Sequence, residues 1–116
     1  MVWDRRRSIR TPLRANGALE LLDGRQPPLA FGITITDVSS GGVGLISGAP
    51  LPVGVQARIS LKEGVLYGSI AHCEAQDGRY AAGLVVLHDP GILLRLMYLA
   101  QLSHPHPRPD PAFARS

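Results

Sequence analysis

The chain has 116 residues, of which 45% are hydrophobic and 18% are charged, a composition that excludes a disordered protein and fits a single domain. Its net charge of +3 is uneven, because residues 1–14 hold five arginines and one aspartate and carry +4, which leaves −1 for the remainder. Aromatic residues make up only 5%, which argues against the stacking surface of a single-stranded RNA binder. The single cysteine excludes an internal disulfide, and no apolar run approaches the roughly 20 residues of a membrane span. We therefore expect a cytoplasmic protein without a membrane span.

The first segment, residues 1–14, contains the stretch Arg5-Arg6-Arg7-Ser8-Ile9-Arg10. Because proline disfavours a helix at Thr11-Pro12, the segment is predicted to be an irregular, flexible arm. Arginine suits planar, bidentate recognition of phosphate or a guanine edge. A strong nucleic-acid binder usually has a wider basic face with lysines, and this chain has one lysine, so nucleic acid is not the expected partner.

Short segments with alternating apolar and polar residues follow, and such alternation is typical of strands that bury one face. Glycine-containing turns separate several of them, for example Asp23-Gly24 and Asp77-Gly78. Six short strands at this spacing predict an all-β fold, a small six-stranded antiparallel β-barrel. The strands are predicted over residues 15–22, 29–36, 43–47, 55–61, 65–74 and 80–87.

A C-terminal helix is predicted over residues 89–102, because Asp89-Pro90 provides an N-cap followed by proline at the first helical position. Apolar residues then recur at three- and four-residue spacing, which predicts a stripe that packs on the barrel. The helix is also compatible with a homodimer or partner contact. The domain is thus predicted to span residues 1–102, with the barrel over 15–88, and the proline-rich residues 103–116 are predicted to be a disordered tail.

The most unusual polar stretch runs from Asp37 to Gly42, between the second and third predicted strands. Its adjacent glycines, Gly41 and Gly42, are typical of a tight turn with positive φ values. Asp37 and Ser39, two residues apart, would place a carboxylate and a hydroxyl on one side of an extended chain. A plain Asx-type turn is the alternative interpretation.

These residues carry a resemblance to a known family. Arg6-x-x-x-Arg10, followed at a distance by Asp37-x-Ser39-x-x-Gly42, resembles the two-part signature of PilZ domains. Residues 69–74 and 80–86 resemble the paired strands near the end of such domains, so that the resemblance covers about residues 5 to 88.

The resemblance implies a barrel that binds the bacterial second messenger cyclic di-GMP (c-di-GMP). In that family the arginine motif, here Arg6 and Arg10, lies on a flexible loop that folds over the ligand. Asp37, Ser39 and Gly42 would hold a guanine from the barrel side. Arg5 resembles the extra basic residue of members that take up two intercalated ligand molecules.

The chemistry of these residue types agrees with those roles. The arginine fork fits guanine O6 and N7 and contributes about 1–3 kcal/mol per good pair, and an ionised aspartate complements the guanine donors at N1 and N2. We therefore predict a c-di-GMP receptor without enzymatic activity, in which closure of the arm alters a surface read by a downstream protein partner. The alternatives are a PilZ-like scaffold that binds no ligand and a weak nucleic-acid binder.

No catalytic residues, metal site or cofactor are predicted. His72 and Cys73 are neighbours in a predicted strand and therefore point to opposite faces. A half-buried histidine beside a core cysteine is expected there rather than a catalytic dyad. The pair in His104-Pro105-His106 lacks the two further ligands of a structural zinc site.

Overall fold

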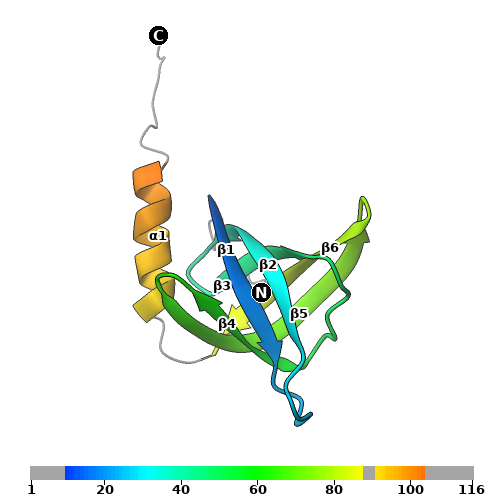
Figure 1. The fold of residues 1–116 in the computed structure, drawn as a ribbon. Coiled ribbons are helices and arrows are strands. Elements are labelled where there is room, and N and C mark those ends of the chain that lie inside the picture. The colour runs from blue at the N-terminus through cyan, green and yellow to red at the C-terminus, as the bar shows by residue number, and fades with distance from the viewer. Residues whose placement is uncertain (1–9, 88–90, 104–116) are drawn as a thin grey trace, which may run out of the picture.

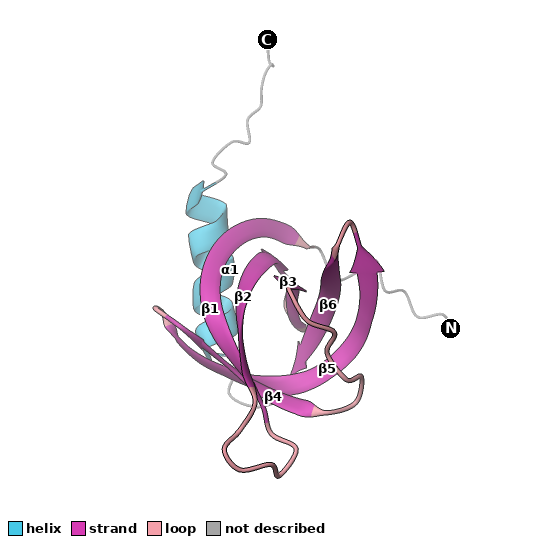
Figure 2. Cartoon of the chain, turned by 45° about the vertical axis from the view of Figure 1, so that its right-hand side comes forward, coloured by secondary structure: helices cyan, strands magenta, loops and turns pink. Residues whose placement is uncertain are grey.

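A computed structural model describes residues 10–87 and 91–103, which form a closed barrel of six strands and one helix (Figures 1 and 2). All neighbouring strands are antiparallel, in the order β1-β2-β3-β6-β5-β4, and β1 also pairs with β4. Closure gives every strand a hydrogen-bonding neighbour on both sides over at least part of its length. The predicted all-β barrel with a C-terminal helix is confirmed. The elements are β1 (Thr11–Leu21), β2 (Ala30–Val38), β3 (Gly42–Ser47), β4 (Gln56–Leu61), β5 (Gly64–Gln76), β6 (Arg79–Val86) and α1 (Gly91–Ser103).

The core fills the interior of the barrel with aliphatic side chains from every strand. Alternate residues of each strand point inward, as the period-two pattern of the sequence requires. Side chains at most 1% exposed include Leu19, Ile35, Val38, Val43, Leu45, Ile59, Leu66 and Ile70.

Between β5 and β6, the predicted Asp77-Gly78 turn adopts positive φ at both residues, which is the conformation that matches the twist of a two-residue hairpin.

The helix α1 lies beside the barrel and contacts β1, β2 and β5 (Figure 1). Leu93, Leu96 and Ala100 are at most 1% exposed, which confirms the predicted apolar stripe. At 13 residues, this helix of the described chain is too short to cross a membrane. The predicted cap at Asp89-Pro90 and the tail beyond Ser103 lie outside the described residues.

The boundary between arm and barrel differs from the prediction. The irregular arm was expected to reach residue 14, but β1 begins at Thr11, which pairs with Val38. Pro12 is accommodated because the β1–β2 register shifts between it and Ala15, and proline, which lacks an N–H, is tolerated at such irregularities. Consequently Arg10 directly precedes a hydrogen-bonded strand and lies next to the end of β2.

We predict that Leu96→Ala lowers the free energy of unfolding by about 2–5 kcal/mol, because it leaves a cavity between α1 and the barrel. The matched control is Leu94→Ala on the same helix, where the side chain is 59% exposed; its effect should stay within about 0.5 kcal/mol. Urea denaturation followed by circular dichroism measures both. Equal effects would mean that α1 is not part of the cooperative barrel core.

Candidate functional site

A lateral row of four residues crosses the outer face of four adjacent strands. Asp37 in β2 pairs with Gly44 in β3, Gly44 pairs with Gly83 in β6, and Gly83 pairs with His72 in β5. The polar side chains of Asp37 and His72 therefore flank two glycines, which have no side chain. We call Gly44 and Gly83 the glycine floor.

A bulge in β2 turns Asp37 to the outer face. Ile33 and Ile35 point into the core, and unbroken alternation would direct residue 37 inward as well. The β2–β3 register shifts between Ile35 and Asp37, so that Val38 is the next fully buried side chain. An extra residue in one strand reverses the phase in this way, and it spares the carboxylate the cost of burial in the core.

A second bulge acts in the same way on β5. Leu66 and Ile70 face the core, and the β5–β6 register shifts between Ile70 and His72. His72 is therefore exposed on the outer face, whereas Cys73 packs partly buried against the core. The prediction that these neighbours face opposite sides is confirmed. The prediction of a half-buried histidine is wrong, because the bulge places its side chain outside.

The glycine floor lets both side chains lie directly on the strand backbone. A Cβ at Gly44 would lie 2.6 Å from Asp37 Oδ2, and a Cβ at Gly83 would lie 2.5 Å from His72 Nε2. Both distances are shorter than any ordinary van der Waals contact, so a side chain at either position would displace the carboxylate or the imidazole.

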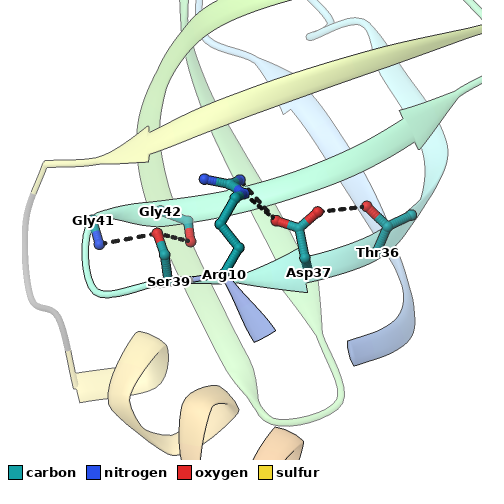
Figure 3. Close-up of polar contacts among 6 residues, drawn as sticks. All are labelled: Arg10, Thr36, Asp37, Ser39, Gly41 and Gly42. Atoms are coloured by element: carbon teal, nitrogen blue, oxygen red, sulfur yellow. Dashed lines mark hydrogen bonds and ion pairs between the residues drawn. The ribbon is translucent and has the colours of Figure 1, made fainter. Parts of the chain in front are cut away.

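Arg10 pairs with Asp37 at one end of the row (Figure 3). Arg10 Nε donates to Asp37 Oδ1 at 2.8 Å, and an Nη atom lies 2.7 Å from the same oxygen. Oδ2 accepts a hydrogen bond from Thr36 Oγ1 at 3.2 Å. The two side chains are 49% and 29% exposed, and an ion pair of this kind contributes only about 0–1 kcal/mol to stability. The predicted arginine and the predicted aspartate thus meet in the structure.

Ser39 and Gly42 build the turn that joins β2 to β3. Ser39 is 3% exposed, and its amide donates to Gly42 O at 2.9 Å. Its Oγ accepts from the amide of Gly41 at 3.3 Å and donates to Gly42 O at 3.5 Å (Figure 3). The alternative interpretation as a side-chain-supported turn therefore holds for Ser39 and not for Asp37, whose recorded partners are Arg10 and Thr36.

The positive φ values expected at the adjacent glycines are not found at Gly41 or Gly42. Gly42 is instead required by close packing, since a Cβ there would lie 2.0 Å from the carbonyl oxygen of Leu84 in β6. Nothing lies within 4 Å of a Cβ at Gly41. The glycine of the signature is thus a packing requirement of the barrel.

Two hollows open along the row, with cavity volumes of about 280 Å³ and 420 Å³. Arg10 and His72 line both hollows and separate them. The smaller extends over the turn after β2 toward Val85, and the larger extends over Gly44 toward Gln76. A concave, mainly apolar surface with a few convergent polar groups is the usual form of a ligand site.

The structure therefore brings together Arg10, Asp37, Ser39 and Gly42, whereas Arg5 and Arg6 lie outside the described residues. The sequence interpretation missed His72, Gly44 and Gly83. The sequence pattern alone does not indicate these three residues, because only the strand register shows that they lie in one row with Asp37. In the described ranges, no three His, Cys, Asp or Glu side chains gather as metal ligands.

Comparison with known proteins identifies the family. The PilZ domain profile matches residues 4–98, which is most of the chain, and the chain belongs to the PilZ family. No curated protein sequence matches it.

Two similar solved structures support the fold. One is the PilZ domain with c-di-GMP of YcgR from Escherichia coli, with a TM-score of 0.58 and 16% identity over 86% of this chain and 97% of that one. The other is YcgR from Escherichia coli in complex with c-di-GMP, with a TM-score of 0.59 and 16% identity over 83% of this chain. This chain spans 44% of the length of that second structure.

We predict that Gly42→Ala destabilises the barrel by about 1–3 kcal/mol or more, because the added methyl group meets a backbone carbonyl that cannot rotate away. Gly41→Ala is the matched control, since its Cβ would meet nothing within 4 Å. Chemical denaturation of the two variants checks this without any ligand. A Gly42→Ala protein as stable as the wild type would show that the glycine serves the ligand alone.

Proposed function

We propose that this PilZ protein is a receptor for c-di-GMP, without catalytic activity, that binds its ligand on the outer face of β2, β3, β6 and β5. One observation carries the proposal. Arg10 and Asp37, which come from the two halves of the signature, are 27 residues apart in sequence and meet at 2.7 Å beside the glycine floor. The family membership and the c-di-GMP named for both YcgR structures support this ligand.

Asp37 is the group that would recognise a guanine. An ionised carboxylate only accepts hydrogen bonds, and the guanine Watson–Crick edge offers donors at N1 and N2. The bulge in β2 directs the carboxylate over Gly44 on the outer face. Thr36 holds Oδ2 at 3.2 Å, so the carboxylate is oriented before the ligand arrives.

Arg10 would exchange its partner when the ligand binds. In the structure two of its nitrogens contact Asp37 Oδ1, the same oxygen that would accept from the base. The ligand brings two phosphates, and a guanidinium binds phosphate or guanine O6 and N7 through parallel hydrogen bonds. The exchange is inexpensive, because the exposed pair that it breaks is worth only about 0–1 kcal/mol.

The glycine floor would keep the recognition groups close to the sheet. A Cβ at Gly44 or Gly83 would collide with the carboxylate of Asp37 or the imidazole of His72; because neither residue has one, both side chains can lie flat on the strands and a planar purine could approach over them. His72 would bound the base on the side opposite Asp37. Arg5 and Arg6, in the segment before β1, would add phosphate and guanine contacts and allow a second, intercalated ligand molecule.

The signal would consist of the new position of this segment. Arg10 directly precedes Thr11 of β1, so release from Asp37 changes the chain at the point where the arm joins the barrel. We infer that a downstream cytoplasmic protein reads this surface.

We expect c-di-GMP to bind the wild-type protein in isothermal titration, and Asp37→Ala and Arg10→Ala each to weaken binding by about 1–3 kcal/mol, roughly fivefold to 150-fold. The melting temperature should hardly change, because the pair is exposed. Asp23→Ala is the matched control, since Asp23 forms a similar ion pair with Arg25 at 3.2 Å, in the turn after β1. Arg5→Ala should lower the stoichiometry from two ligands per chain to one.

Each alternative gives a different titration. A folded wild-type protein that releases no heat would favour a scaffold that works through protein contacts alone. Binding of nucleic acid that falls steeply with salt and ignores Asp37→Ala would favour a phosphate-binding arm.

A second prediction tests the floor. Gly44→Ala should reduce c-di-GMP affinity about tenfold or more, because the methyl group displaces the carboxylate that recognises the base. The fold should be retained, since the methyl group meets the end of a side chain rather than backbone. Gly32→Ala in β2 is the control, because its Cβ would have open space. Unchanged affinity in Gly44→Ala would place the base elsewhere.

A further inference from the structure

The helix α1 lies beside the barrel (Figure 1), and it carries an exposed apolar stripe on the face opposite its buried residues. Leu94, Tyr98 and Leu102 are 59%, 62% and 58% exposed. Spaced four residues apart, they lie on one face of the helix. We call these three residues the outer stripe; they are distinct from Leu93 and Leu96, which pack on the barrel.

The helix as a whole is apolar around most of its circumference. Its 13 residues, GILLRLMYLAQLS, contain one charged side chain, Arg95. A helix that is hydrophobic on all sides is normally buried on all sides, and the barrel covers only the inner face. The outer stripe is therefore a contact surface that the described residues of one chain leave open.

The charge pattern argues against a membrane as the occupant. Helices that lie in a membrane interface carry lysines and arginines along their polar flank. Within α1 only Arg95 could play that part. The helix also offers no acidic residue for a basic partner. The charges on α1 therefore favour neither a lipid surface nor an oppositely charged protein as the partner of the outer stripe.

The stripe is instead complementary to itself. Tyr98 has a leucine four residues before it and another four residues after it. In an antiparallel arrangement about a two-fold axis at Tyr98, Leu94 meets Leu102 of a second copy, and the two tyrosines meet each other. Isologous contacts have this symmetry. Arg95 then lies opposite Gln101 of the second copy, so the two like charges stay apart.

Helix geometry supports the same arrangement. Residues four apart form a ridge, and two such ridges interdigitate at a crossing angle of about −50°, the commonest class in globular proteins. At that angle two helices touch only over a few turns, which matches a stripe of three residues. Tyrosine rings at the crossing point can pack edge to face or offset.

We propose that the outer stripe of α1 is a homodimer interface, in which two copies of this chain cross antiparallel about Tyr98. The proposal does not depend on the ligand site, which lies on the outer face of β2, β3, β6 and β5. The short contact predicts a dimer that dissociates on dilution.

Directed disulfide formation tests the arrangement, in a Cys73→Ser background that removes the native thiol. Tyr98→Cys chains should cross-link with themselves on mild oxidation. Leu94→Cys and Leu102→Cys chains should cross-link when mixed and remain single when oxidised separately. Val53→Cys is the control, because Val53 is 61% exposed outside the helix. Cross-linking of Leu94→Cys alone, or of Val53→Cys as readily as Tyr98→Cys, would overturn the antiparallel interface.

Sedimentation velocity of the unmodified full chain provides a second test. Across about three decades of concentration, the mass should rise from the 12.4 kDa of one chain toward twice that value. Tyr98→Asp should raise the dissociation constant about tenfold or more, since central aromatic residues dominate such contacts. Val53→Asp should leave it unchanged, and circular dichroism confirms that each variant is folded.

Two outcomes overturn the proposal. A monomer at every concentration would leave the stripe to a different protein. Flotation with phosphatidylglycerol vesicles that Tyr98→Asp abolishes would assign the stripe to a lipid surface instead.

Discussion

Side chains along a β-strand alternate between its two faces, and the arrangement of both the core and the candidate site depends on this alternation. A closed barrel of six strands has one inside and one outside, and each side chain belongs to one of them according to its position in the alternation. The hydrophobic pattern alone would send Asp37 and His72 into the core. Bulges in β2 and β5 reverse the phase at the required places, and the outer row of the site exists because of these two irregularities.

The bulges turn Asp37 and His72 outward, and Gly44 and Gly83 leave the space that these side chains occupy. With the phase reversed, Asp37 and His72 face outward over neighbouring strands, and side chains at Gly44 and Gly83 would collide with them. Without those glycines the carboxylate and the imidazole would be pushed away from the sheet. Gly42 serves a different need, because its close contact is with the backbone of Leu84. Gly42 and Gly44 are only two residues apart in β3, yet Gly42 is required by the packing of the barrel and Gly44 by the position of the Asp37 carboxylate.

The Arg10–Asp37 pair links the start of β1 to the end of β2. It is too exposed to contribute much to the stability of the barrel; in the proposed receptor it would keep both groups in place until the ligand binds. The carboxylate is held by Arg10 on one oxygen and by Thr36 on the other. Such preorganisation lowers the ordering cost of binding, and in the proposed exchange only the arginine would have to leave.

Much of the fold could be predicted from the sequence, because alternation and turn residues act locally. The strands, their number and the helix with its buried face all follow from such signals, and the motif spacing brought Arg10 and Asp37 to one site. The partnership of His72 with Gly83 could not be predicted, since it depends on a register shift between strands distant in the chain. The same holds for the start of β1 at Thr11, where pairing with Val38 overrides the local preference of a proline-containing segment.

Closure of the barrel also limits how a binding event can be transmitted. Switching requires an element with two arrangements of similar free energy, and a closed ring of hydrogen-bonded strands around a packed core does not provide one. In the proposed receptor the contact between Arg10 and Asp37 would provide such an element, because it is exposed, weak and made by the residue directly before β1. We therefore expect the response to the proposed ligand to be confined to the segment before β1 and the rim of the site. The outer stripe belongs to a helix held on the barrel by Leu93, Leu96 and Ala100, so we expect the proposed dimer contact to be independent of the proposed ligand site.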